Sequence, residues 1–332
     1  MVHKLPMSRE NRRRTAVLVR LTLLAVLLAV PIFVKEPDQT LFWSAFFNAG
    51  HASLFGVAAL LVASLLKLIP GVAGEVKRFV QAIVVTLVLG AASELLQLFD
   101  STRDASVADF LRDAAGATAF LLLRVAVAAP GVKVRSRPAP GVRVASGLLA
   151  VSLLLAVAVP FLLVVDNYVE RDRTFPTLFR LDGSRRERPF VSTGDADLVP
   201  KAMPRAGLAP ASGPLALLSL KAGVYPGLVL DEPYPDWRGF SRLVFTAYSD
   251  DDTPLALTIR IHDVWHDQRY EDRFNKTIVI TRGEHQIAIP LDEIRRAPQD
   301  REMDLRQVRG IMIFAHRLER PAHVYLGPIR LE

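Results

Sequence analysis

Ionisable side chains interrupt a part of the sequence that is otherwise apolar enough to lie in a membrane. The stretch SELLQLFDSTRDASVADFLRDAAG, residues 93–116, contains three carboxylates, Glu94, Asp109 and Asp113. A histidine, His51, lies near the start of an earlier apolar run. Charged groups in hydrocarbon are costly and are usually retained where they face protein or water and serve a function. An imidazole with carboxylates suits proton transfer, recognition of a polar ligand or binding of a divalent metal ion.

Helices long enough to cross a bilayer would position these groups. A spanning helix needs about 20 mainly apolar residues. Five runs meet this requirement, at residues 15–34, 45–69, 79–99, 105–129 and 144–165. The fourth run is the most polar, because Asp109, Arg112 and Asp113 lie in its first half, but it is apolar from residue 114 onward apart from Arg124. A long arginine side chain near a helix end can extend to the membrane surface.

Helical geometry brings the ionisable groups to a similar depth. His51 lies about 10 Å inside the second run at 1.5 Å per residue. Glu94 and Gln97 are one turn apart and share a face, and Asp109 and Asp113 form an i, i+4 pair. We therefore predict one polar cluster near the outer ends of three helices, made of His51, Glu94, Gln97, Arg103, Ser106, Asp109 and Asp113.

The basic residues predict the orientation of the helices. Lysine and arginine are concentrated before residue 15, between the second and third runs, and between the fourth and fifth runs. Basic loops stay in the cytoplasm, so the N-terminus is expected inside and the chain after Val165 outside. The first run ends without a small-residue cleavage site, which favours a retained anchor over a signal peptide. Because the net charge of +7 arises in these flanking segments, we expect a lipid bilayer and no nucleic acid as partner.

A change in composition near residue 166 divides the chain. We expect a basic cytoplasmic tail at residues 1–14, a transmembrane domain at 15–165 and an extracytoplasmic domain at 166–332. This organisation predicts a multi-pass protein of the cell (inner) membrane. The chain has no cysteine, which excludes disulfides, thiolate metal sites and cysteine nucleophiles.

The second half has the pattern of β-strands. In PLALTIRI, residues 254–261, the apolar side chains of Leu255, Leu257, Ile259 and Ile261 alternate with other residues, which is typical of a half-buried strand. Further short runs of this kind are separated by turn sequences such as SDDDTP and TRGEH, as in a β-sandwich. The predicted fold class is an α-helical membrane bundle of about five transmembrane helices, followed by an all-β, jelly-roll-like sandwich.

The polar pattern in the helical half resembles that of the VanZ-like family of bacterial membrane proteins. The resemblance rests on NAGHASLFGVAALL and on SELLQLFDSTRDASVADFLRDAAGATAF, and it covers roughly residues 15–130. It implies that the family positions correspond here to His51, Glu94, Gln97, Phe99, Arg103, Ser106, Asp109, Asp113 and Gly116. The family is named after low-level glycopeptide resistance, and the resemblance implies a shared helical fold without an enzyme class.

Four interpretations of the cluster remain open at this point. It could be a buried hydrogen-bond network between helices, or a pocket for a headgroup, a glycan or a proton. Metal binding through His51, Glu94, Asp109 and Asp113 is chemically reasonable, but no compact ligand motif is present, so no metal or cofactor is expected. Acid–base catalysis would need a substrate and a nucleophile that the sequence does not indicate. Whether the protein is an enzyme stays open, with a non-catalytic role favoured.

The end of the chain, about residues 219–332, resembles the galactose-binding-like sandwiches of carbohydrate-binding modules. This resemblance implies a sugar-binding role for aromatic residues in loops. The candidate contacts are Trp237, Asp263, Trp265, His266 and Tyr270, with Asp236 and Asp267 beside them. A sugar can stack on an exposed ring, although either tryptophan could equally close the core. Asp250, Asp251 and Asp252 could bind Ca²⁺ or form a solvated turn.

These observations favour a bacterial cell-envelope protein that recognises or handles envelope polysaccharide or a lipid-linked glycan precursor. Two other functions fit the same residues. The chain could be a membrane-embedded enzyme that uses the His/Glu/Asp cluster on a lipid or glycan, or a purely structural membrane anchor.

Overall fold

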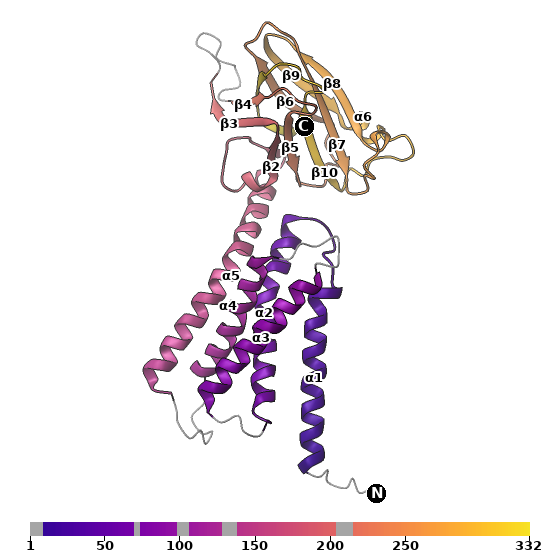
Figure 1. The fold of residues 1–332 in the computed structure, drawn as a ribbon. Helices are drawn as coiled ribbons and strands as arrows, with labels where there is room; N and C mark the ends of the chain where they lie inside the picture. Colours follow the sequence, from indigo (N-terminus) through magenta and orange to yellow (C-terminus); the bar gives the residue numbers. More distant parts are fainter. Residues whose placement is uncertain (1–8, 70–73, 98–105, 128–137, 204–214) are drawn as a thin grey trace. The chain divides into compact units, whose positions relative to one another are not determined.

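Two compact units make up the chain, Met1–Val164 and Val165–Glu332. The structure, a computed structural model, describes residues 9–69, 74–97, 106–127, 138–203 and 215–332. The first unit is helical and the second is built mainly of strands (Figure 1).

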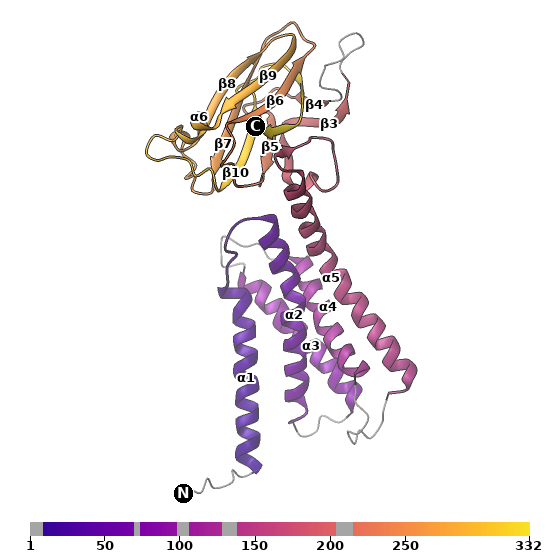
Figure 2. The ribbon, with the colours of Figure 1, turned by 180° about the vertical axis from the view of Figure 1, so that it is seen from behind.

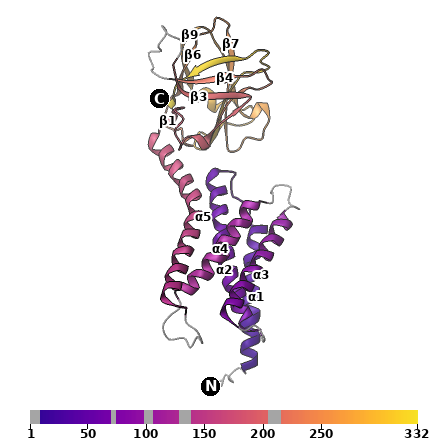
Figure 3. The same ribbon diagram turned by 60° about the vertical axis from the view of Figure 1, so that its left-hand side comes forward.

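Successive helices of the first unit run in opposite directions alongside one another (Figures 1 and 3). They are α1 Arg9–Phe33, α2 Leu41–Leu66, α3 Glu75–Gln97, α4 Val107–Ala126 and α5 Pro140–Thr174. Within the described residues, four segments are long and apolar enough to cross a membrane: Glu10–Pro31, Leu41–Leu66, Glu75–Leu96 and Pro140–Thr174.

Helix α4 is not among these four segments, although it forms where the sequence predicts it. Ser106 is its N-cap, and the Ser106 hydroxyl accepts a hydrogen bond from the Asp109 backbone N–H at 3.4 Å. Twenty residues give a helix about 30 Å long, which matches the hydrocarbon thickness. Its four charged residues keep its hydropathy low, so a crossing by α4 stays a prediction.

Small residues allow α2 and α4 to approach closely. A Cβ atom added to Gly116 of α4 would lie 2.0 Å from the Ala52 carbonyl oxygen of α2. Such backbone contact is typical of glycine and alanine at helix interfaces in membranes. The buried core beside it is formed by Ala59, Val62, Ala63, Ala82, Ala117 and Leu121. This packing determines how residues of α2 and α4 face one another.

The second unit is a sandwich of two antiparallel sheets (Figures 1 and 2). The larger sheet contains β1 Thr177–Phe179, β3 Ala196–Ala202, β4 Leu215–Leu220, β6 Arg242–Ser249, β9 Gly283–Pro290, β11 Ala322–Leu326 and β12 Ile329–Leu331. Its order is β1-β12-β6-β11-β4-β3, and β9 pairs with β6. The smaller sheet has the order β2-β5-β10-β7-β8, with β2 Val191–Gly194, β5 Gly227–Asp231, β7 Leu255–Asp263, β8 Phe274–Ile280 and β10 Val308–Phe314. Three short helices complete the unit: η1 Arg188–Phe190, η2 Tyr270–Asp272 and α6 Leu291–Arg295.

Strand β7 shows how the sequence pattern builds this sandwich. Leu257, Ile259 and Ile261 are fully buried between the sheets, while the residues between them are exposed or half-buried. This alternation is the one expected for a strand with one buried face. The predicted fold class, a helical region followed by an antiparallel β-sandwich, is confirmed.

Helix α5 extends beyond the apolar run predicted at residues 144–165. Its last turns, from Val165 through Thr174, belong to the second unit and carry charged side chains. Arg186 contacts Asp166 at 2.8 Å and Glu170 at 3.4 Å, and the Arg171 guanidinium donates to the Glu232 carbonyl at 3.3 Å. Residues 166–174 are therefore helical, although the second half has the sequence pattern of strands, and acidic residues one turn apart along this helix share an arginine partner.

Candidate functional site

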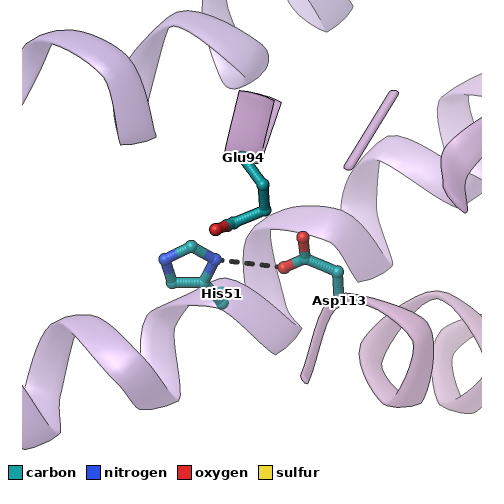
Figure 4. A group of neighbouring side chains, drawn as sticks. All are labelled: His51, Glu94 and Asp113. Carbon is teal, nitrogen blue, oxygen red and sulfur yellow. Dashed lines mark hydrogen bonds and ion pairs between the residues drawn. The ribbon is translucent and has the colours of Figure 1, made fainter. Parts of the chain in front are cut away.

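Side chains from three helices point toward one another in the first unit (Figure 4). His51 of α2, Glu94 of α3 and Asp113 of α4 each offer one nitrogen or oxygen atom, and these three atoms lie within 4.8 Å of one another. His51 Nδ1 lies 3.1 Å from Asp113 Oδ1. We call these three residues the helical triad.

The carboxylates of the helical triad are buried. Asp113 is 1% exposed and Glu94 is 7% exposed, whereas the His51 side chain keeps 17% of its surface accessible. One Glu94 oxygen, Oε2, accepts a hydrogen bond from the Ser106 backbone N–H at 3.0 Å. The other Glu94 oxygen, Oε1, and Asp113 Oδ2 are buried and have no hydrogen-bond partner among the described residues. A buried acceptor without a partner costs about 1–3 kcal/mol.

The other predicted members of the polar cluster have separate roles or lie outside the described residues. Asp109 forms an ion pair with Arg112, and Arg112 also donates to the Asn48 side-chain oxygen at 3.3 Å. Ser106 caps α4 and gives its backbone N–H to Glu94. Arg103 and the side chain of Gln97 are outside the part of the chain that the structure describes.

Gly90 belongs to this site and was not identified from the sequence. A Cβ atom at Gly90 would lie 3.0 Å from Asp113 Oδ2 and 3.4 Å from the Phe55 ring. Gly90 stands one turn before Glu94 on α3, and that spacing was the signal available in the sequence. Its lack of a side chain leaves room for the Asp113 carboxylate between the helices.

Trp237 is not a surface contact for a sugar, which corrects one prediction from the sequence. Its ring is fully buried, and its Nε1–H donates to the Tyr234 carbonyl oxygen at 2.8 Å. The indole therefore belongs to the core of the sandwich, because a stacking platform must be exposed.

Asp263 and His266 are likewise buried and so cannot take sugar hydroxyls. Both Asp263 oxygens accept from the Arg301 guanidinium, at 2.6 and 2.8 Å. Arg301 also donates to both Asp272 oxygens, at 2.5 and 3.1 Å. His266 Nδ1 lies 2.9 Å from the Asp272 carbonyl oxygen. These polar groups hold the connection between β7 and β8 in place.

The charges in this network shift the pKa values of its members. Hydrogen bonds from Arg301 lower the pKa of Asp272 to about 2. The two carboxylates raise the pKa of Arg301 above its ordinary value. Nearby, burial together with the adjacent His266 lowers the pKa of His262 to about 4, so that its ring is neutral near pH 7. The Arg301 ion pairs therefore fix the side chains beneath the β7–β8 connection.

Two aromatic side chains project from this connection. Trp265 and Tyr270 are each 64% exposed. The Trp265 backbone N–H donates to Asp263 at 3.2 Å, and the Arg273 guanidinium lies 5.5 Å from the centre of the Tyr270 ring. Of the five candidate glycan contacts, these two have the accessibility that stacking requires. Asp236 and Asp267 are held by Arg238 and Arg269, respectively.

The acidic turn after β6 directs its three carboxylates to different partners. Asp250 contacts His323 at 2.5 Å, Asp251 accepts from the Thr253 backbone N–H at 3.0 Å, and Asp252 contacts Arg282 at 2.7 Å. This arrangement favours a turn over a Ca²⁺ site, because calcium requires converging oxygens.

Comparison with known proteins gives structural similarities only for part of the chain. No family model matches it, and no curated protein matches it. A family 11 carbohydrate-binding module from Clostridium thermocellum, in complex with a β-1,3-1,4-mixed-linked tetrasaccharide, is 16% identical and covers 42% of this chain and 86% of its own, with a TM-score of 0.32. A family 30 module of a cellulosomal cellulase from the same organism has 14% identity, 43% and 90% coverage and a TM-score of 0.31. An exo-β-agarase has 17% identity, 47% and 24% coverage and a TM-score of 0.37. These values do not assign a ligand to this chain.

Proposed function

We propose that this chain is a multi-pass protein of the bacterial inner membrane, with VanZ-like helices and a glycan-binding sandwich outside the cytoplasm. Four helices of membrane-spanning length and the polar pattern around His51, Glu94 and Asp113 support the first part. The exposed rings of Trp265 and Tyr270 support the second. Envelope polysaccharide and lipid-linked glycan precursors are the ligands that this combination favours.

The glycan proposal rests on two exposed aromatic rings, Trp265 and Tyr270, in the same connection between β7 and β8. The ion pairs of Arg301 hold this connection in place. An indole or phenol ring offers a flat apolar surface to the C–H face of a sugar, and such rings contribute large contact area at interfaces. Arg301 binds both Asp263 and Asp272, which lie at the two ends of the connection. A platform fixed before binding loses less conformational entropy when the ligand arrives.

Replacing Trp265 by Ala is expected to weaken saccharide binding by at least about tenfold, because a central aromatic contact is commonly worth more than 1 kcal/mol. The full chain in detergent would be titrated by calorimetry with soluble β-glucan, agaro-oligosaccharide and peptidoglycan fragments. Tyr225→Ala is the matched control, since Tyr225 is a 56% exposed aromatic residue between β4 and β5. Equal affinities of a folded Trp265→Ala variant and the unaltered chain would contradict the proposal, as would an equal loss in Tyr225→Ala.

The proposed orientation predicts that Glu332 lies outside the cytoplasm. The basic segments before residue 15, after the second apolar run and after the fourth place the N-terminus inside, and an odd number of crossings then exports the sandwich. Alkaline phosphatase fused after Glu332 should be active in cells, whereas a fluorescent protein that folds only in the cytoplasm should be dark. The reverse pair of results would contradict both the orientation and the crossing by α4.

A second function follows from the buried carboxylates of the helical triad. Glu94 Oε1 and Asp113 Oδ2 are unpartnered among the described residues, as expected of groups that handle a proton or a polar substrate. In a membrane enzyme, Glu94→Gln would abolish activity in cells while the sandwich still binds saccharide. For a purely structural anchor, the same variant would leave function intact as long as the helices fold.

A further inference from the structure

The geometry points to a divalent metal site of the Zn²⁺ and Mn²⁺ class in the helical triad, with His51, Glu94 and Asp113 as its ligands. The inference concerns the helical unit and does not depend on glycan binding by the sandwich. It rests on the spacing of the donor atoms, on two buried carboxylate oxygens without hydrogen-bond partners among the described residues, and on the lack of an ion pair between these carboxylates and any described lysine or arginine.

The donor spacing fits a tetrahedral ion. Zinc binds histidine nitrogen and carboxylate oxygen at about 2.0–2.2 Å, which places neighbouring ligands of a tetrahedron roughly 3.3 Å apart. His51 Nδ1 and Asp113 Oδ1 are already 3.1 Å apart, and the Glu94 atom of the set lies within 4.8 Å of both. Figure 4 shows the Glu94 carboxylate reaching toward the His51 ring, which Asp113 contacts. Three protein ligands leave the fourth position open for water or a substrate oxygen.

The unpartnered oxygens give independent support. Asp113 is 99% buried and Glu94 is 93% buried, and each has one oxygen without a hydrogen bond among the described residues. The Glu94 oxygen that does have a partner accepts from the Ser106 backbone N–H, which also fixes the direction of the carboxylate. Ligating carboxylates are commonly oriented by such additional hydrogen bonds. A cation at the triad would supply positive charge to the two carboxylates that carry these free oxygens.

The charges around the helical triad differ from those around a second trio, in the sandwich, whose carboxylate is paired with an arginine. The sandwich contains a comparable trio of one histidine and two carboxylates, His266, Asp267 and Asp272, within the same 4.8 Å. There Arg301 occupies both oxygens of Asp272. In the helical unit, Arg112 is paired with Asp109, and no described lysine or arginine forms an ion pair with Glu94 or Asp113. Among the described residues, the two buried carboxylates thus have His51 as their nearest basic side chain, and a divalent ion would balance their negative charge.

The type of ion follows from the donor atoms. One imidazole with two carboxylates suits zinc or manganese, whereas magnesium and calcium favour sites made entirely of oxygen, and copper(I) favours sulfur. Access is available from the side of His51, whose side chain keeps 17% of its surface exposed. The two carboxylates of the site are thus buried, and its histidine is the ligand that remains partly accessible.

The test uses the full chain in lipid nanodiscs, stripped with chelator and titrated with Co²⁺, whose visible absorption is strong in tetrahedral sites. We expect one Co²⁺ per chain, displaced by Zn²⁺. Glu94→Gln should lower the affinity by at least about 100-fold, because even groups that only orient a ligand are worth 10–100-fold. This variant keeps an oxygen that can accept the Ser106 N–H, so the helices should fold as before, which circular dichroism would verify. Asp113→Asn and His51→Ala should show the same loss.

Asp109→Asn is the matched control, since it makes the same chemical change one turn earlier on α4 in a residue paired with Arg112. It should leave the affinity and the visible spectrum unchanged. The proposal would be overturned if the unaltered chain showed no tetrahedral Co²⁺ spectrum at saturating metal. It would equally be overturned if Asp109→Asn reduced binding as much as Glu94→Gln. That result would mean that the ion is attracted to several carboxylates in general and not bound by the helical triad. Because saccharide binding is read out separately, neither result affects the glycan proposal.

Discussion

Replacing Arg301 by Met is expected to lower the free energy of unfolding of the second unit by about 3–5 kcal/mol, since removing one partner leaves buried charges uncompensated. Arg301 makes four contacts with the carboxylates of Asp263 and Asp272, which are 1% and 7% exposed. Methionine fills a similar volume but neutralises neither carboxylate. Urea denaturation of residues 165–332, followed by circular dichroism, would measure the loss.

The control for this prediction is Arg306→Met. Arg306 is 60% exposed and pairs with Asp304 at 3.0 Å, and exposed pairs of this kind contribute less than about 1 kcal/mol. If Arg301→Met and Arg306→Met have equal effects, the Arg301 network does not stabilise the sandwich. If an Arg301→Met variant is as stable as the unaltered chain but loses saccharide binding, the network positions Trp265 and does not stabilise the fold.

Lowering the pH from about 6.5 to 4 is expected to destabilise the sandwich by up to about 3 kcal/mol through His262 alone. The pKa of His262 in the folded unit is about 4, because burial and the neighbouring His266, Arg260 and Arg273 oppose its protonation and Asp263 favours it only in part. An unfolded histidine titrates near 6.5. Between these two values the unfolded chain binds the extra proton, so stability is complete above pH 6.5 and falls as the pH is lowered.

Urea unfolding of residues 165–332 at several pH values would measure this dependence. His262→Gln should flatten the pH profile between 4 and 6.5, whereas His316→Gln, at an exposed position, should retain the slope of the unaltered chain. Asp272 contributes at lower pH, since its pKa of about 2 lies below the usual range of aspartate. An unchanged slope in His262→Gln would show that another group is responsible.

The general fold could be predicted from the sequence because periodicity depends on local chemistry. The alternation in β7 and the long apolar runs of α2, α3 and α5 lead directly to strands and helices with known faces. The extension of α5 to Thr174 could not be predicted in the same way. There Asp166 and Glu170 pair with Arg186, up to 20 positions away in the sequence, which no local pattern indicates.

In the candidate sites, too, some features follow from the local sequence and others depend on residues far apart in the chain. The depths of His51 and Asp113 follow from the helical rise, but the rotation that makes them face one another depends on the close contact at Gly116. In the sandwich, the sequence made Trp237 and Trp265 candidate sugar contacts and left a place in the core open for each. Only Trp265 is exposed, because burial of Trp237 results from the strands that cover it and not from its neighbours in sequence.

The ion pairs and hydrogen bonds of α4 have a consequence for biogenesis. Its polar first half depends on partners in helices made earlier, since Asp113 contacts His51, Arg112 contacts Asn48, and Ser106 contacts Glu94. In the proposed membrane protein, the ribosome synthesises α2 and α3 before α4. We therefore expect α4 to be inserted poorly by the translocation machinery on its own and to be admitted together with, or after, the two preceding segments. The contacts that unite the three helices would then also determine when α4 enters lipid relative to α2 and α3.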